Sequence, residues 1–419
     1  MLCTEQQLRA DFRSYVRRRL MSAVQLFGSV PKSEYQSIVT DFVTTLASQR
    51  IPYGDIYARS LGAFPTLVKE ALQKSRSNPG IAPDASAVPL TAECEWTPWE
   101  DDELDPIDAQ WYFDMPTAQR IVGMFASGTN SVLALGTPTV ASVAASKIDN
   151  VTLVDISQRF TRDADAAWPA LKNVNITCHD LDEEIYSGVT KADVVVMDPP
   201  WYIESYQAWL HSAVSNCRSD GMLVVALPQI LTSRRSLPER QAIIAILEKV
   251  GNVQLVPDAL TYLTPSFELP VLEASDLQFL KQWRHGDIAV INVRKTDLPY
   301  EFPAMRNIQW KTRNVYGRIV RTCYENLAEG TLPVIEPFEG TSGYRLTQVT
   351  RNYLWSSSAN LVTSRGRAAT VTTWGALPHI LDLLEAGYEV ESSVGKALPS
   401  ASTPDRTGLA GTLSAILRN

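Results

Sequence analysis

Several common sequence signals are scarce or missing in this chain. Only five cysteines occur in 419 residues, none in a CxxC pair, so neither a disulfide framework nor a zinc knuckle is indicated. The four histidines are scattered, and we expect no metal site. No apolar run is long enough to cross a bilayer and no signal-peptide core follows the first residues, so we expect a cytoplasmic protein without membrane contact.

The chain also has no excess of basic residues. The formal net charge is −8, which argues against non-specific coating of nucleic acid but still allows a local basic patch. Hydrophobic residues make up 45% of the chain and charged residues 20%, an ordinary globular composition. A chain of this length exceeds one hydrophobic core, so more than one domain is expected.

Local patterns divide the chain into four parts. Helical spacing of apolar residues over 4–27, 31–48 and 66–74 predicts a helical unit at the N-terminus. A polar segment rich in proline and serine then reads as a linker. The predicted parts are an N-terminal helical domain (1–75), a linker (76–106), a central sheet domain (107–300) and a C-terminal α+β extension (301–419).

The central part carries the strongest pattern. Short apolar runs alternate with helical stretches, which predicts a buried, mostly parallel sheet of the doubly wound, Rossmann-like α/β class with seven strands. The expected strands cover 131–135, 151–155, 174–177, 192–197, 221–227, 253–256 and 288–293. Because ligands of such sheets bind beyond the carboxyl ends of the strands, the chemistry is expected just after each run.

The segment "VVVMDPPWYI" (194–203) follows the fourth expected strand. Asp198 can accept one hydrogen bond from an NH₂ group, and a carbonyl beside Pro199 and Pro200 can accept the other, because proline offers no competing backbone donor. Trp201 or Tyr202 would supply a flat face for stacking. These groups direct the nitrogen lone pair toward an electrophile, so the reaction would be methyl transfer promoted by positioning. A rigid turn without chemistry is the alternative interpretation.

The first three expected strands end in residues suited to a nucleotide-like cofactor. Gly136 would let the backbone approach a ligand closely, and Asp155 could accept hydrogen bonds from two ribose hydroxyls. Asp180, or the backbone beside it, could contact an adenine amino group. Each also has a structural explanation: a strand-to-helix turn, a helix cap and a surface acid, respectively.

Together these segments resemble a known family. "DPPW" (198–201) after the fourth strand resembles the class I S-adenosylmethionine-dependent amino methyltransferases, whose motif is Asp/Asn-Pro-Pro-aromatic. "QWYF" (110–113), "LGTPTV" (135–140) and "VDISQRF" (154–160) are similar to segments of the probable N6-adenine methyltransferase family, which includes adenine and lysine methyltransferases. The resemblance covers roughly residues 107–295. The single glycine of the "LGTPTV" turn departs from the glycine-rich loop of the wider class.

The resemblance implies S-adenosylmethionine as the cofactor and assigns roles to individual residues. The implied cofactor-binding residues are Gly136, Thr137, Pro138, Asp155, Asp180 and Leu181. The implied catalytic residues are Asp198, Pro199, Pro200 and Trp201. Tyr202, Gln110 and Trp111 are expected to bind the substrate.

Four functions fit these expectations. The favoured one is methylation of adenine N6 in DNA or RNA, with a flipped base held at Asp198. A lysine methyltransferase acting on a basic protein, an aminopropyltransferase acting on a polyamine, and a non-catalytic subunit are the alternatives. Nucleic acid and protein thus both stand as partners, and the oligomeric state is left open.

The region beyond residue 300 is read from local patterns alone. The stretches Arg306–Arg321 and Arg345–Arg367 are basic and contain aromatic residues, so they either track phosphates or form ordinary solvated surface. Residues 374–390 are expected to form an amphipathic helix that ends at Gly387. The tail from 396 is expected to be loosely structured.

Overall fold

The computed structural model describes residues 30–49, 51, 53–76, 110–125, 127–157, 160, 171–188, 190–277, 280, 282–294, 310–323, 332–337, 341–342, 344–346 and 360–417, with Ser14 and Arg18. The chain forms two compact units. The first comprises Met1–Thr97, Tyr112–Leu263 and Phe279–Met305, and the second comprises Pro98–Trp111, Thr264–Gln278 and Arg306–Asn419. Apart from Ser14 and Arg18, the predicted helix over 4–27 lies outside the described residues, as does nearly all of the predicted linker.

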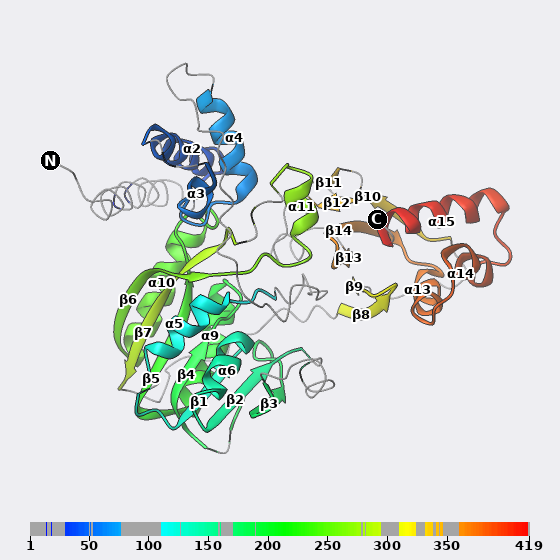
Figure 1. Cartoon of the computed structure of the whole chain (residues 1–419). Helices are drawn as coiled ribbons and strands as arrows, with labels where there is room; N and C mark the ends of the chain where they lie inside the picture. Colours follow the sequence, from blue (N-terminus) through cyan, green and yellow to red (C-terminus); the bar gives the residue numbers. More distant parts are fainter. Residues whose placement is uncertain are drawn as a thin grey trace. The chain divides into compact units, whose positions relative to one another are not determined.

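The first unit contains a seven-stranded sheet in the order β3-β2-β1-β4-β5-β7-β6 (Figure 1). Its strands are β1 (Ser131–Leu135), β2 (Asn150–Asp155), β3 (Val174–Cys178), β4 (Ala192–Met197), β5 (Cys217–Pro228), β6 (Gly251–Thr261) and β7 (His285–Val293). Strands β1 to β5 pair in parallel, and β7 runs antiparallel between β5 and β6. All seven predicted strands are confirmed, as is the doubly wound α/β class.

Four described helices accompany this sheet; the first precedes β1 and the other three each connect two strands. They are α5 (Met115–Gly123), α6 (Pro138–Ala145), α9 (Ile203–Asn216) and α10 (Ser236–Val250). The side chain of Asp114 caps α5 by accepting a hydrogen bond from the backbone N–H of Thr117 (2.9 Å). Pro138 occupies the first turn of α6, where a missing N–H costs nothing. Helix α5 packs against α6, and α9 packs against α10.

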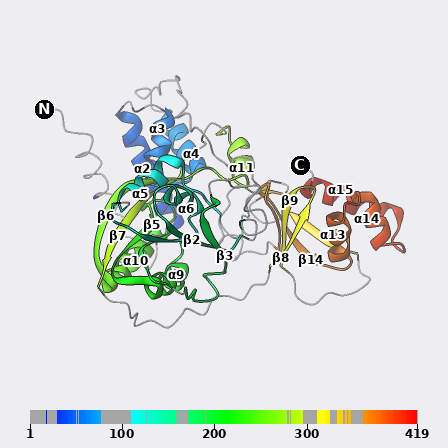
Figure 2. The same cartoon turned by 60° about the horizontal axis from the view of Figure 1, so that its bottom comes forward.

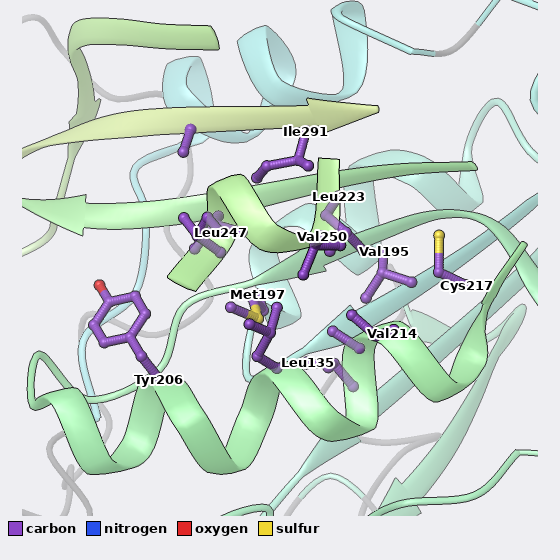
Figure 3. Packing of buried hydrophobic residues seen from close by; sticks show 14 of the residues in the cluster. Leu135, Val195, Met197, Tyr206, Val214, Cys217, Leu223, Leu247, Val250 and Ile291 are labelled. Carbon is purple, nitrogen blue, oxygen red and sulfur yellow. The ribbon is translucent and has the colours of Figure 1, made fainter. Parts of the chain in front are cut away.

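The core of the first unit explains why its strands are continuous apolar runs. Leu135, Val195 and Met197 pack between the sheet and α9, where Tyr206 and Val214 lie (Figure 3). All five are buried. Burial of each such side chain contributes about 1.5–3 kcal/mol, so strands covered on both faces leave no place for alternating polar residues.

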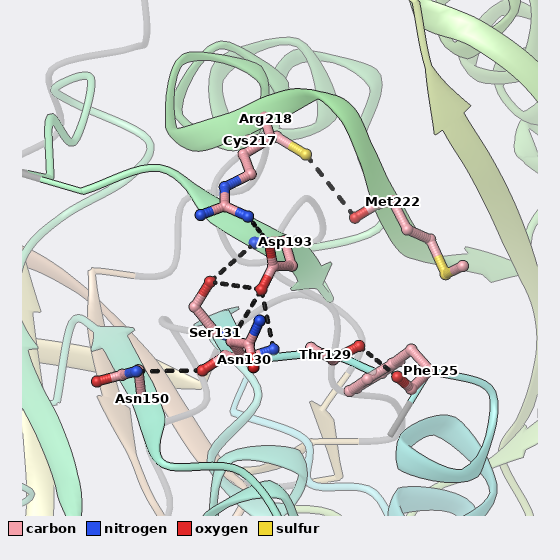
Figure 4. Close-up of polar contacts among 9 residues, drawn as sticks. All are labelled: Phe125, Thr129, Asn130, Ser131, Asn150, Asp193, Cys217, Arg218 and Met222. Carbon is pink, nitrogen blue, oxygen red and sulfur yellow. Dashed lines mark hydrogen bonds and ion pairs between the residues drawn. The ribbon is translucent and has the colours of Figure 1, made fainter. Parts of the chain in front are cut away.

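A polar cluster fastens the amino-terminal edge of the sheet (Figure 4). The carboxylate of Asp193, in β4, accepts hydrogen bonds from the backbone N–H groups of Asn130 (2.9 Å) and Ser131 (3.0 Å) and forms an ion pair with Arg218. Burial opposes ionisation of this carboxyl, but the hydrogen bonds and Arg218 outweigh it and lower its pKa. The cluster sets the starts of β1, β4 and β5 side by side.

The N-terminal helices belong to the same compact unit as the sheet. They are α2 (Lys32–Ser48), α3 (Tyr53–Ala58) and α4 (Pro65–Arg76); α3 was not predicted. The Tyr35 hydroxyl donates to the carbonyl of Leu231 (2.6 Å), and the Leu231 N–H donates to the carbonyl of Leu61 (2.9 Å). Leu231 lies just beyond the carboxyl end of β5, so the helices hold the loop that borders the expected site.

The second unit is an α+β structure with its own sheet and core (Figure 2). Its elements are α11 (Leu269–Glu273), β8 (Trp310–Val315), β9 (Arg318–Cys323), β10 (Val334–Pro337), β11 (Thr341–Ser342), β12 (Arg345–Leu346), β13 (Leu361–Thr363), β14 (Arg367–Thr373), α13 (Leu377–Glu385), α14 (Val390–Ala397) and α15 (Thr403–Leu417). The expected amphipathic helix over 374–390 is present in a shorter form, as α13. The prediction of a loosely structured tail from residue 396 was wrong. Leu409, Leu413 and Ile416 of α15 are buried in the core of the unit, so apolar spacing rather than aromatic content orders this segment.

The described residues also bear on three smaller points. None of the described helices is long and apolar enough to cross a membrane. Cys178, Cys217 and Cys323 are free thiols. Within the described ranges, no grouping of His, Cys, Asp and Glu could hold a metal ion.

Candidate functional site

The strand directions place all expected site residues of the sheet at one edge. Because β1 to β5 are parallel and β6 runs the same way, their carboxyl ends share this edge with the start of β7. Asp198 follows β4, Tyr262 follows β6 and Arg284 precedes β7. Residues that are far apart in the sequence therefore meet beyond the sheet.

Asp198 is oriented by two aromatic side chains. The Tyr262 hydroxyl donates a hydrogen bond to Oδ1 of Asp198 (2.9 Å), and the Trp201 side chain also hydrogen bonds to this carboxyl. The rings of Trp201 and Tyr262 meet edge to face, with centroids 5.5 Å apart and an interplanar angle of 82°. This packing fixes both donors, and hence the direction in which the carboxyl group can accept a further hydrogen bond.

The environment of Asp198 changes its protonation. Burial of the carboxyl group disfavours its charge and raises its pKa to about 7, although the hydrogen bonds from Tyr262 and Trp201 and the positive charge of Arg284 act in the opposite direction. Burial and the negative charge of Asp198 raise the pKa of the Tyr262 phenol, which therefore stays a donor. Asp198 is thus poised to change charge near neutral pH, as functional carboxyl groups often do.

The turn after Asp198 is compact. The Asp198 N–H donates to the carbonyl of Leu135 (3.3 Å), and the Tyr202 N–H donates to the carbonyl of Pro200 (2.6 Å). Pro199 is buried, and Pro200 and Tyr202 are partly exposed. Tyr202 then begins α9 as its N-cap residue. The Asp-Pro-Pro-aromatic segment therefore forms a rigid strand-to-helix turn that carries the carboxyl group.

Gly136 is required by both conformation and space. Its φ of +61° lies in the left-handed region, and a Cβ there would meet Cη2 and Cζ3 of Trp209 at 2.5 and 2.7 Å. Trp209, in α9, donates its indole N–H to Asp182 (2.8 Å), which also accepts a hydrogen bond from Ser205 (3.3 Å). The glycine turn after β1 is thus packed directly against the helix that follows Asp198.

The other expected cofactor residues also lie at this edge. Asp155 is buried and accepts a hydrogen bond from the Ser157 N–H (2.8 Å), and Asp180 accepts one from the Asp182 N–H (2.9 Å). Leu181 is buried. Each of these hydrogen bonds closes a turn within two residues along the chain.

The turn beside Gly136 contains an unpaired hydroxyl. Thr137 precedes the first residue of α6, Pro138, and both are buried. The Thr137 Oγ1 has no hydrogen-bond partner among the described residues. An unpaired buried hydroxyl costs about 1–3 kcal/mol, which a ligand atom at this turn would offset.

Gln110 and Trp111 belong to the second unit, whereas Asp198 belongs to the first. There Trp111 contacts Phe267 edge to face, with ring centroids 6.2 Å apart. The following residues belong to the first unit, where Phe113 pairs with Tyr262 as an antiparallel bridge and their rings lie 4.9 Å apart. The end of the "QWYF" segment therefore supports the residue that orients Asp198.

Two residues of the site were not predicted from the sequence. Tyr262 follows the edge strand β6 and Arg284 precedes its neighbour β7, and neither residue belongs to a local motif. Their positions could have been suspected from the rule that ligands bind at this edge, but only after β7 was known to run antiparallel. Their pairing with Asp198 and Trp201 depends on contacts between distant parts of the chain.

The sequence model of the probable N6-adenine methyltransferase family matches residues 105–262. The matched segment includes β1 to β6, the Asp-Pro-Pro-Trp turn and Tyr262. This part of the chain resembles the family, as its motifs predict. The match ends before Arg284 and leaves out the N-terminal helices and most of the second unit. No curated protein sequence matches the chain.

Several solved structures are similar to parts of the chain at low identity. A branched-chain polyamine synthase mutein from Thermus thermophilus is 15% identical, with 70% of this chain and 96% of that chain covered and a TM-score of 0.47. The N-methyltransferase NodS from Bradyrhizobium japonicum is 14% identical, with coverages of 43% and 94% and a TM-score of 0.31. A ribosomal protein L11 methylase from Lactobacillus delbrueckii is 15% identical, with coverages of 42% and 77% and a TM-score of 0.29. These similarities say nothing of what this chain acts on.

Proposed function

We propose that the chain is an S-adenosylmethionine-dependent N-methyltransferase whose target is an exocyclic amino group, adenine N6 in DNA or RNA. The observation that carries this proposal is the Asp198 carboxyl group at the end of β4, held by Tyr262 and Trp201 in an Asp-Pro-Pro-Trp turn. The family match over residues 105–262 supports it, since that family is described as adenine methyltransferases.

The residues around Gly136 fit the proposed cofactor. The unpaired hydroxyl of Thr137 offers a donor beside the turn, and Asp155 offers carboxylate oxygens for ribose hydroxyls. Ile156, next to Asp155, is 38% exposed, so an apolar side chain is available to pack against a purine. When bound, S-adenosylmethionine supplies an electrophilic methyl group.

The chain's own contribution to the reaction is positioning. Ionised Asp198 accepts a hydrogen bond from the target NH₂ group, and a carbonyl of the proline turn accepts another. Both bonds orient the nitrogen lone pair, and such orientation accounts for a large share of rate enhancement in two-substrate reactions. Tyr262 and Trp201 keep the carboxyl group in place and favour its ionised form.

Calorimetric titration tests the cofactor first. We expect S-adenosylmethionine and S-adenosylhomocysteine to bind, and Asp155→Ala to weaken both by about tenfold because it removes a charged acceptor. Preference for decarboxylated S-adenosylmethionine would instead favour aminopropyl transfer. Absence of binding to all three would contradict the proposal.

A labelled methyl donor then tests the target. Purified protein is incubated with single-stranded DNA, RNA, a basic protein or spermidine, and incorporation into each is measured. Label in adenine N6 is the expected result. Label in lysine would retain N-methyl transfer but replace the nucleic-acid substrate with a protein.

A further inference from the structure

Arg284 lies beside the proposed target site, and the chemistry above does not use it. Its guanidinium carbon is 5.1 Å from the ring centroid of Trp201 and 5.4 Å from that of Trp283. Arginine commonly stacks on aromatic faces in this way, with its N–H groups left at the rim of the planar group. The side chain of Arg284 is partly exposed.

Besides Trp201, two parts of the fold hold this arginine in place. The Tyr262 N–H donates to the backbone carbonyl of Arg284 (3.0 Å), which ties it to the residue that orients Asp198. Trp283 meets Phe64 of the N-terminal helices edge to face, with centroids 5.5 Å apart and an interplanar angle of 83°. The guanidinium group is thus a built part of the site, fixed by the turn after β6 and by the helical region.

A permanent positive charge at this place has a consequence for the substrate. Arginine stays protonated at all physiological pH values, and its charge acts on Asp198. An amine carried on a lysine or polyamine brings positive charge of its own and is repelled. An adenine amino group is neutral, and the phosphates of its nucleotide are attracted and can accept hydrogen bonds from a guanidinium group.

The geometry points to Arg284 as the residue that selects the charge of the substrate. It favours a neutral amino group on a phosphate-bearing nucleotide and disfavours amines on cationic chains. This inference rests on the proposed N-methyltransferase function and names the substrate class of the same site.

The test measures binding of a fluorescein-labelled single-stranded oligodeoxyadenylate to the full chain saturated with S-adenosylhomocysteine, over a series of salt concentrations. Spermidine is the cationic probe. Wild type is compared with Arg284→Gln, which removes the charge, and Arg284→Lys, which keeps it. Arg218→Gln is the matched control, because Arg218 lies at the opposite edge of the sheet and its side chain is 52% exposed.

We expect Arg284→Gln to weaken oligonucleotide binding by about tenfold at low salt and to reduce the salt slope by about one, as loss of one phosphate contact does. Arg284→Lys should keep the slope, and the control should match wild type. Spermidine should bind Arg284→Gln better than wild type. An unchanged slope in Arg284→Gln, or tighter spermidine binding by wild type than by the variant, would overturn the inference. Thermal melting shows whether each variant is folded.

The two proposals fail in different ways. If S-adenosylhomocysteine does not bind wild type, the proposed methyltransferase function is contradicted. If it binds and methyl groups are transferred to a cationic amine at a rate that Arg284→Gln does not change, N-methyl transfer stands, whereas the role of Arg284 and the nucleotide substrate are contradicted.

Discussion

Two aspartates stand at opposite ends of β4, and their surroundings differ in kind. Asp193 receives hydrogen bonds from Asn130 and Ser131 and pairs with Arg218, so its pKa is lowered despite partial burial. Asp198 is partly exposed as well, but there burial outweighs its donors and raises its pKa to about 7. At the amino-terminal edge of the sheet, hydrogen bonds and an ion pair stabilise the charge of Asp193. At the carboxyl edge, the protonation of Asp198 can still respond to a bound substrate. The difference separates a residue that fastens strands from one suited to chemistry.

The largest expected effect comes from removing the carboxyl group at the functional end. Asp198→Ala should lower the rate of methyl transfer by at least about a hundredfold, because the target amine loses its orienting acceptor. Binding of S-adenosylhomocysteine and the far-ultraviolet circular dichroism spectrum should stay close to wild type. A near wild-type rate in a labelled-methyl assay would contradict the assignment of Asp198.

The second effect concerns pH. Because the ionised form of Asp198 accepts the hydrogen bond, activity should rise with pH through a midpoint near the pKa of about 7. Tyr262→Phe removes a donor that favours the carboxylate, so its midpoint should move to higher pH and its rate at neutral pH should fall by up to about tenfold. Rate measurements from pH 5 to about pH 9 decide this. Identical profiles for both proteins would exclude a role for Tyr262 in setting the protonation of Asp198.

The shifted pKa values also affect the stability of the fold, and the effects at the two aspartates have opposite signs. An acid whose pKa is raised above its unfolded value of about 3.9 stabilises the fold below that value and loses this contribution as pH rises toward about 7. Asp198→Asn should therefore gain stability relative to wild type between pH 5 and about pH 8, by roughly 1–3 kcal/mol. Urea denaturation of both proteins at these two pH values measures the difference in their free energies of unfolding. A constant difference between the two proteins would show that burial of this carboxylate carries no such cost.

Much of this comparison could be predicted from the sequence, and part of it could not. The runs that form β1 to β7 are strongly apolar, and the Asp-Pro-Pro-Trp turn marks the functional end of β4 within a local motif. Tyr262, Arg284 and the contact of Trp209 with Gly136 depend on how distant strands and helices meet. No local spacing encodes such contacts.

The second unit also contains features that could not be predicted from the sequence. Arg313 belongs to a stretch considered for phosphate contacts, yet its side chain is buried and pairs with Asp382 (2.8 Å) and Thr322 (3.0 Å). Burial and partner choice separate a structural arginine from a binding one, and neither can be read from a basic sequence. The tail after 396 was underestimated for a related reason, since its leucines gain their role only by packing against β14 and α14.

The smallest effect is expected at the structural end of β4. Asp193→Asn keeps the shape of the side chain and one acceptor oxygen but removes the charge that pairs with the exposed Arg218. We expect a loss of about 0.5–1.5 kcal/mol in the free energy of unfolding at neutral pH, with methyl transfer unchanged. Because the pKa of Asp193 is lowered, its contribution is present above the unfolded value of about 3.9 and is lost as pH falls below it. The difference from wild type should therefore shrink toward acidic pH, the reverse of the trend at Asp198. A variant that lost activity while keeping its stability would instead show that the two ends of β4 are coupled, and that the amino-terminal cluster helps to position the site.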